Sequence, residues 1–353
     1  MTPQDTRIAF FGGANNAAAL DAVIALAKAG FDITVCDHDP REAVALRGAG
    51  VTFCSTRAEA LAGRSVVLTC EAAPDDVEEL FCGSDGLLEV MQPGSTAIDL
   101  SFSLPQLARE IHAMGAISDI QVFDAPLVRL GDSESTTIFV GGQGGRQSSI
   151  EPLLPHLATR VWRFDEPGEG QFAAMLAHIS FAGSLMGTVE SLAIARIAEF
   201  PREATLDVLA STAGASRALA EYAPRIMAGS FDGNLKVADL LQALEVVLEA
   251  ADSLDVTVPM TETAAQLFDL LSTVGGEDLD VCALALLYAD EQTCASHGLD
   301  WELASSEDFD ADDDGPGAGF GLGDFFEMGS PGDDDDDSES GGHFPYSGFF
   351  SKN

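Results

Sequence analysis

The sequence predicts an α/β domain, then an all-helical domain, then an acidic tail. Between residues 7 and 165, short β-type runs alternate with helical stretches, which indicates βαβ units and a parallel sheet. From Gly168 to about His297 only helical periodicity remains. From Glu307 onward, acidic blocks with glycine, proline and serine show no period, which is typical of disorder. We therefore predict domains at residues 1–166 and 167–303, and a disordered acidic tail at 304–353.

The α/β domain begins with a strand, a helix, a second strand and a second helix. Strands are predicted at RIAFFG (7–12), DITVCD (32–37), SVVLTC (65–70), STAIDLS (95–101), QVFDAP (121–126) and TTIFVGG (136–142). The first two helices are predicted at NAAALDAVIALAKAG (16–30) and PREAVALRGAG (40–50). These strands are rich in valine, isoleucine and phenylalanine, as expected for the buried strands of a parallel sheet.

The helical domain is predicted from six periodic segments. They are 170–199, 202–211, 215–227, 236–254, 260–273 and 279–296. Thr261 stands before an acid and an apolar run, so it is predicted to cap a helix. No Asp, Glu, Lys or Arg occurs between Glu169 and Glu190, a length that could span a bilayer. Polar residues interrupt the run and no basic residue flanks it, so we predict a buried helix of a two-domain or dimeric core.

Composition limits the partners and the compartment. The net charge of −41 repels phosphate backbones, which argues against nucleic-acid binding. The six cysteines form no CxxC pair, and the N-terminus lacks the pattern of a secretory signal, so a cytoplasmic protein is expected. No metal site is predicted. The tail carries seven phenylalanines among its acids, so it is either a dispensable end or a segment that docks a partner.

A glycine-rich turn follows the first strand and precedes the first helix. In a dinucleotide-binding turn, the pattern G-x-G-x-x-G/A lets the backbone approach the pyrophosphate, which lies at the helix N-terminus. The candidate cofactor-binding residues are Gly12, Gly13, Ala14, Asn15, Asn16 and Asp37. Gly12 supplies the first glycine and Ala17 is an allowed third residue, but Ala14 replaces the second glycine.

Asp37 ends the second strand, where an acid accepts hydrogen bonds from ribose hydroxyls and repels a 2′-phosphate. This favours NAD over NADP as the cofactor. The alternative is a nucleotide fold that no longer binds nucleotide, because the Ala14 methyl group points where the pyrophosphate should lie.

The order of several short motifs resembles the β-hydroxyacid dehydrogenases, the group of 3-hydroxyisobutyrate dehydrogenase and 6-phosphogluconate-dehydrogenase-like proteins. The motifs are FFGGANNAA, ITVCDHDP, AIDLS, FDAPLVRLG, TTIFVGG, GEGQFAAMLAHIS, VADLLQAL and GGEDLDVCAL. The resemblance covers residues 7 to about 297. It implies a Rossmann domain, a long interdomain helix, a helical domain used for dimerisation, and hydride transfer between a hydroxy acid and a nicotinamide.

The sequence departs from this family where catalysis is expected. The interdomain helix of the family opens with G-x-G-x-x-x-K-x-x-N-N. Gly168 and Gly170 match, but Ala174 replaces the catalytic lysine, and Ala177 and His178 replace the asparagines. The substrate loop keeps Asp124, Ala125 and Pro126 but has Val128, Arg129 and Leu130 for Ser-Gly-Gly, and Ala238 replaces a later lysine.

Four other residues are candidates for the site. His178 lies one helical turn from Ala174 and could transfer a proton; it could equally be a buried neutral histidine. Arg129 could hold a substrate carboxylate or be a solvated loop arginine. Ser101 follows a strand end and could contact substrate or cap a helix. Asp239 is retained from the family pattern and is a candidate for substrate binding.

Three functions remain open at this point. The chain could be a divergent NAD(P)-dependent oxidoreductase with altered or reduced chemistry on a small-molecule substrate such as a small carboxylic acid. Imine reductases resemble this family with the lysine exchanged, although Ala174 is neither acidic nor a tyrosine. It could also be a catalytically inactive dimeric scaffold whose tail or cleft binds a partner, or an NAD(H)-binding sensor. In each case we expect a homodimer or larger and no membrane association.

Overall fold

The computed structural model describes residues 6–13, 16–36, 43–131, 135–142 and 150–306. The described residues up to Ser306 form one compact unit. The predicted acidic tail, and the cofactor candidates Ala14, Asn15 and Asp37, lie outside the described residues.

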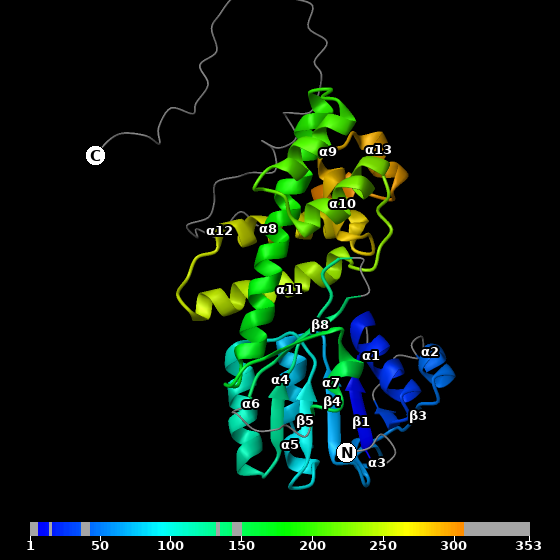
Figure 1. The fold of residues 1–353 in the computed structure, drawn as a ribbon, viewed down its shortest axis with the longest axis vertical. Coiled ribbons are helices and arrows are strands. Elements are labelled where there is room, and N and C mark those ends of the chain that lie inside the picture. Colours follow the sequence, from blue (N-terminus) through cyan, green and yellow to red (C-terminus); the bar gives the residue numbers. More distant parts are fainter. Residues whose placement is uncertain (1–5, 14–15, 37–42, 132–134, 143–149, 307–353) are drawn as a thin grey trace, which may run out of the picture. The chain divides into compact units, whose positions relative to one another are not determined.

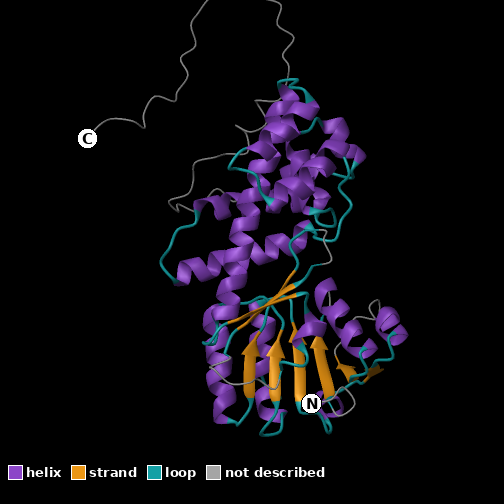
Figure 2. Ribbon diagram, viewed as in Figure 1, coloured by secondary structure: helices purple, strands orange, loops and turns teal. Residues whose placement is uncertain are grey.

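A six-stranded parallel sheet in the order β3-β2-β1-β4-β5-β6 forms the first domain (Figure 2). The strands are β1 (Arg7–Gly12), β2 (Asp32–Cys36), β3 (Thr52–Phe53), β4 (Val66–Cys70), β5 (Thr96–Asp99) and β6 (Gln121–Asp124). The accompanying helices are α1 (Ala17–Lys28), α2 (Ala43–Gly48), α3 (Arg57–Leu61), α4 (Pro74–Cys82), α5 (Leu87–Val90) and α6 (Pro105–Ile117). The chain order reverses between β1 and β4, and ligands of open α/β sheets bind beyond the strand ends at such a point.

Both faces of this sheet are covered, which explains its nearly continuous apolar strands. Alternate residues of β1 point to opposite faces. Ile8 and Phe10 belong to the core formed with α1 and α7 (Leu154–Leu157), whereas Ala9 and Phe11 belong to the core formed with α4 and α6. The predicted α/β domain with a parallel sheet is confirmed.

A small second sheet joins the first domain to the helical one. It has the order β7 (Leu127–Val128), β8 (Thr137–Val140) and β9 (Arg160–Arg163). Of these strands, only β8 is predicted from the sequence. β9 escapes notice because its sequence RVWR is short and lies mostly exposed to solvent.

The helical domain begins with the long helix α8 (Glu169–Ile197), whose path can be followed in Figure 1. It continues through α9 (Arg202–Ser211), α10 (Arg217–Ala228), α11 (Val237–Ser253), α12 (Pro259–Leu271), a π turn (Ser272–Gly276), a 3₁₀ helix (Val281–Tyr288), α13 (Glu291–Ser296) and α14 (Trp301–Ser306). The predicted order of an α/β domain followed by an all-α domain is therefore confirmed.

Two local predictions in the helical domain are wrong. Segment 279–296 is not one regular helix, because the 3₁₀ helix ends before Asp290, whose side chain accepts a hydrogen bond from the Thr293 amide at 2.9 Å and starts α13. Thr261 does not cap α12. The helix begins earlier, at Pro259, where the fixed φ of proline favours the first helical turn, and Thr261 is buried inside it.

By length and composition, α8 could cross a membrane. Its second half, however, contributes Ala182, Leu185, Met186 and Val189 to the apolar core of the helical domain. That core also contains residues of α10, α11 and α12, so α8 packs as the central helix of a bundle. This packing favours the interpretation of α8 as a core helix.

Candidate functional site

The glycine turn at the end of β1 brings the backbone against β4. Gly12 has φ +75°, and a Cβ added there would lie 2.3 Å from the Cys70 carbonyl oxygen. Gly13 has φ +88°, its amide donates to the same carbonyl at 2.6 Å, and a Cβ there would lie 2.7 Å from the Phe10 ring. Both positions therefore require glycine. The turn lies at the β1–β4 switch point, where the ligands of open α/β sheets bind.

Asn16 caps the helix that follows this turn. Its Oδ1 accepts a hydrogen bond from the Ala19 amide at 2.9 Å, so Asn16 satisfies one of the amides at the start of α1. Of the predicted cofactor residues, the structure thus brings Gly12, Gly13 and Asn16 to one turn at the N-terminus of α1.

The ends of β4 and β5 are joined by a buried network around Asp99. Its Oδ1 accepts hydrogen bonds from Thr69 Oγ1 at 2.9 Å, from the Ser101 amide at 3.1 Å and from Ser101 Oγ at 2.5 Å. Burial raises the pKa of Asp99 to about 6, although the hydrogen bonds from Ser101 and Thr69 act in the opposite direction.

Ser101 is fully buried in this network. Its hydroxyl donates to Asp99 and accepts a hydrogen bond from the Glu71 amide at 2.8 Å. The side chain therefore holds the ends of two strands together. It does not cap α6, which begins at Pro105 after an N-cap without a side-chain hydrogen bond.

Asp124, at the end of β6, anchors the start of α8. Its carboxylate accepts hydrogen bonds from the Gly168 amide at 2.9 Å and the Gln171 amide at 3.1 Å. A negative charge is stabilising at a helix N-terminus. Burial acts in the opposite direction, because it raises the pKa of Asp124 and so disfavours the charged carboxylate. A Cβ at Gly170 would lie 2.7 Å from the Asp124 carboxylate, which explains the glycine there.

Gln171 completes the joint between α8 and the α/β domain. Its side-chain Nε2 donates to the Ser101 carbonyl oxygen at 2.8 Å, and its side-chain Oε1 accepts a hydrogen bond from the Ser103 backbone amide at 2.9 Å. The only sequence signal for this role is the polar side chain of Gln171 at the start of the uncharged run between Glu169 and Glu190. The joint places the next turns of α8 beside the loop that follows β5.

Ala174 and His178 lie one turn apart on α8, as predicted, and both are buried. Ala174 is fully buried and His178 is 8% exposed. The His178 ring stacks on Phe102 with their centroids 4.6 Å apart, and its Nδ1 lies 2.9 Å from the Ala174 carbonyl oxygen. Burial lowers the pKa of His178 to about 4, so the ring is neutral near neutral pH.

An apolar cluster surrounds this part of the helix. Met175 packs with Val247 and Ala250 of α11, and Phe102 and Ile179 border the same cluster. An apolar surrounding of this kind favours neutral groups, because it penalises charged ones through desolvation.

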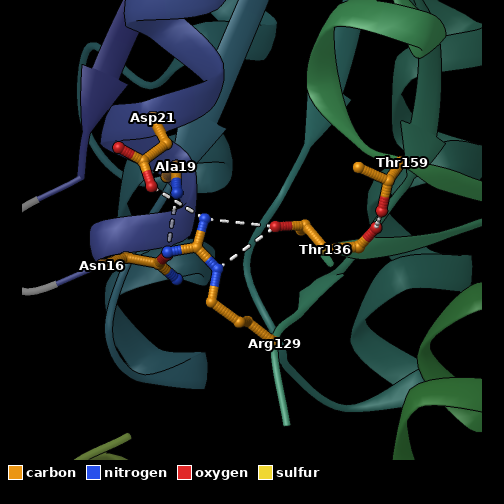
Figure 3. A network of polar contacts seen from close by, with 6 residues as sticks. All are labelled: Asn16, Ala19, Asp21, Arg129, Thr136 and Thr159. Atoms are coloured by element: carbon orange, nitrogen blue, oxygen red, sulfur yellow. Dashed lines mark hydrogen bonds and ion pairs between the residues drawn. The ribbon is translucent and has the colours of Figure 1, made fainter. Parts of the chain in front are cut away.

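Arg129 follows β7 and is held by two partners (Figure 3). Its guanidinium pairs with Asp21 of α1 at 2.8 Å and donates to Thr136 Oγ1 at 3.2 Å. The side chain is only 17% exposed, so Arg129 is not a solvated loop residue. It connects the predicted substrate loop to α1, the helix after the glycine turn, and a substrate carboxylate would have to compete with Asp21 for it.

Asp239 lies in the first turn of α11. Its carboxylate accepts a hydrogen bond from the Lys236 amide at 3.3 Å, which makes it a capping residue of that helix. Among the described residues, no group of three or more His, Cys, Asp or Glu side chains could hold a metal ion.

Comparisons with known proteins agree with this arrangement. Residues 7–164 match the NAD-binding domain of 6-phosphogluconate dehydrogenase, and residues 168–288 match the NAD-binding domain of NADP-dependent 3-hydroxyisobutyrate dehydrogenase. A probable 3-hydroxyisobutyrate dehydrogenase-like protein of Arabidopsis thaliana is 27% identical over 81% of this chain and 86% of its own length. The 3-hydroxyisobutyrate dehydrogenase of Pseudomonas aeruginosa is 26% identical over 80% and 98%.

Solved structures show the same fold. The Mycobacterium tuberculosis 3-hydroxyisobutyrate dehydrogenase with L-serine has a TM-score of 0.71 and 22% identity, covering 81% of this chain and 99% of its own. From the two family matches, the relatives and the fold, the chain belongs to the β-hydroxyacid dehydrogenase family of NAD(P)-dependent oxidoreductases.

Proposed function

We propose that the protein is a divergent oxidoreductase. It keeps the dinucleotide-binding crevice of its family but no longer oxidises hydroxy acids with the help of a catalytic lysine. One observation carries this proposal. By the motif resemblance, the family's lysine corresponds to Ala174, which is fully buried beside a neutral histidine and an apolar cluster. A positioned proton-transfer group contributes about 10²–10⁴-fold to rate, so ordinary hydroxy-acid oxidation should be slower by that order.

His178 is a poor replacement for the lysine. With a pKa of about 4, only about one ring in a thousand carries a proton at pH 7. Its Nδ1 is engaged by the Ala174 carbonyl oxygen, and its face is covered by Phe102. The altered chemistry we propose therefore acts on a small-molecule substrate that needs no proton from α8.

We propose NAD rather than NADP as the cofactor, with Gly12, Gly13 and Asn16 at the pyrophosphate and Asp37 at the ribose. The bound cofactor would accept or supply a hydride. The protein residues would position it, since glycine backbone at the switch point and the start of α1 attract phosphate groups.

An NAD(H)-binding sensor or an inactive dimeric scaffold is the second candidate. The stack of Phe102 on His178 favours a protein without catalysis, because two packed rings lie beside Ala174, which corresponds to the family's lysine by resemblance. A sensor would bind NADH without transferring hydride, whereas a scaffold would bind no dinucleotide at all.

We also propose a homodimer in the cytoplasm. The α8 side chains Phe172, Leu176, Ile194 and Ile197 expose apolar surface, with Leu176 53% and Ile197 74% exposed. Apolar surface of this kind is commonly buried between subunits. Light scattering at micromolar concentration should give at least a dimer, and a monomer would contradict this part of the proposal.

The experiment that tests the proposed function combines binding with turnover. Fluorescence titration should show NADH binding more tightly than NADPH, since Asp37 opposes a 2′-phosphate. A panel of carbonyl compounds and imines is then screened for NADH oxidation. Binding with turnover on this panel supports the oxidoreductase, binding without any turnover supports the sensor, and absence of NADH binding refutes both and leaves the scaffold.

A further inference from the structure

Glu71 places a carboxylate against the nucleotide-binding turn. It directly follows β4, on the other side of the switch point from Gly12. A Cβ added to Gly12 would lie 2.7 Å from Glu71 Oε1 and 2.9 Å from Glu71 Cδ. The carboxylate therefore lies beside the Gly12 backbone, at the place where the crevice opens between β1 and β4.

The main chain of Glu71 is fixed in this place. Its amide donates to Ser101 Oγ at 2.8 Å, and Ser101 is itself held by the buried Asp99. The Gly13 amide donates to the Cys70 carbonyl oxygen, which ties the preceding residue to the turn. The side chain of Glu71 is half-buried, so its charge is screened less than that of an exposed acid.

A dinucleotide brings two phosphate charges to such a turn, where backbone amides attract them. A carboxylate within a few ångströms of the same backbone repels them. We propose that Glu71 is an affinity-determining residue that weakens dinucleotide binding in this crevice. This inference rests on the proposed function, because it requires the dinucleotide to bind at the Gly12 turn.

Replacing Glu71 by glutamine keeps its length and its main-chain hydrogen bond but removes the charge. The E71Q variant should bind NADH about tenfold more tightly than the wild type at low salt, because one charge–charge repulsion at short range is lost. The gain should shrink as salt is added. Glu78→Gln is the matched control, since it removes the same charge from an exposed position on α4 and should leave the affinity unchanged.

The experiment is a fluorescence titration of NADH into the wild type, E71Q and E78Q at low and high salt, with circular dichroism to verify folding. Tighter binding by E71Q alone supports the proposal. Equal affinity of all three proteins overturns it, as does weaker binding by E71Q, which would mean that the carboxylate bonds a ribose hydroxyl. In both of these results the proposed function survives. If neither folded wild type nor folded E71Q binds NADH, the proposed function and this inference both fail.

Discussion

Replacing His178 by glutamine should make the protein less sensitive to acid. The folded-state pKa of His178 is lowered from 6.5 to about 4 by burial, so the unfolded chain binds a proton in a range where the folded chain does not. The contribution of neutral His178 to stability is therefore complete above about pH 6.5 and is lost as the pH falls towards 4. A difference of about 2.5 pKa units corresponds to roughly 3 kcal/mol in total, of which about 2.5 kcal/mol has been lost at pH 4.5.

The assay is urea unfolding of the wild type and His178→Gln at several pH values between 4.5 and 7.5. Relative to the wild type, the variant should become more stable by about 2–3 kcal/mol on going from pH 7.5 to pH 4.5. His156→Gln, on the short helix α7, shows the effect of removing another histidine. A constant difference between wild type and His178→Gln across this range would refute the claim that His178 is neutral and buried.

Three further predictions concern Asp124, Asp99 and Ala174. Asp124→Ala leaves the Gly168 and Gln171 amides without their acceptor and should lower the free energy of unfolding by about 2–4 kcal/mol; an unchanged urea midpoint would argue against the anchor. Burial raises the pKa of Asp99 to about 6, so its ionisation destabilises the fold as the pH rises from about 4 to 6. Asp99→Asn should therefore gain about 2–3 kcal/mol relative to the wild type over that range, and a relative loss in urea unfolding between about pH 4 and 6.5 would contradict this sign. Ala174→Lys alone should restore little hydroxy-acid oxidation, because burial would depress the pKa of the new amine; recovery by two orders of magnitude in kcat/KM would show that the rest of the site is intact.

Much of the fold follows from the sequence, because its strands and helices differ clearly in period and length. The strand at RIAFFG is found as β1, and the uncharged run after Glu169 is found as the single helix α8. The short β9 and the interruption at Asp290 could not be predicted, because β9 lies mostly exposed and lacks the apolar run of the buried strands, and the 3₁₀ helix before Asp290 is as apolar as a buried regular helix.

The candidate site was predicted in part. The turn at Gly12 and Gly13 follows from a local pattern, and the structure gives its reason in the contact with Cys70. The partners of Arg129 and Ser101 could not be predicted, because Asp21 and Glu71 are distant from them in the sequence. The stack of Phe102 on His178 likewise depends on how α8 docks against the loop after β5.

We propose that this family member holds a dinucleotide but lacks the proton-transfer group for hydroxy-acid oxidation. The most direct measurement is a single-turnover experiment in which the protein, saturated with NAD⁺, is mixed with 3-hydroxyisobutyrate or L-serine and nicotinamide absorbance is followed. We predict bound NAD⁺ and no burst of NADH on the timescale of enzymatic turnover. A rapid burst equal to the concentration of sites would contradict the account, because Ala174 and the neutral His178 could not then be the groups that decide the chemistry.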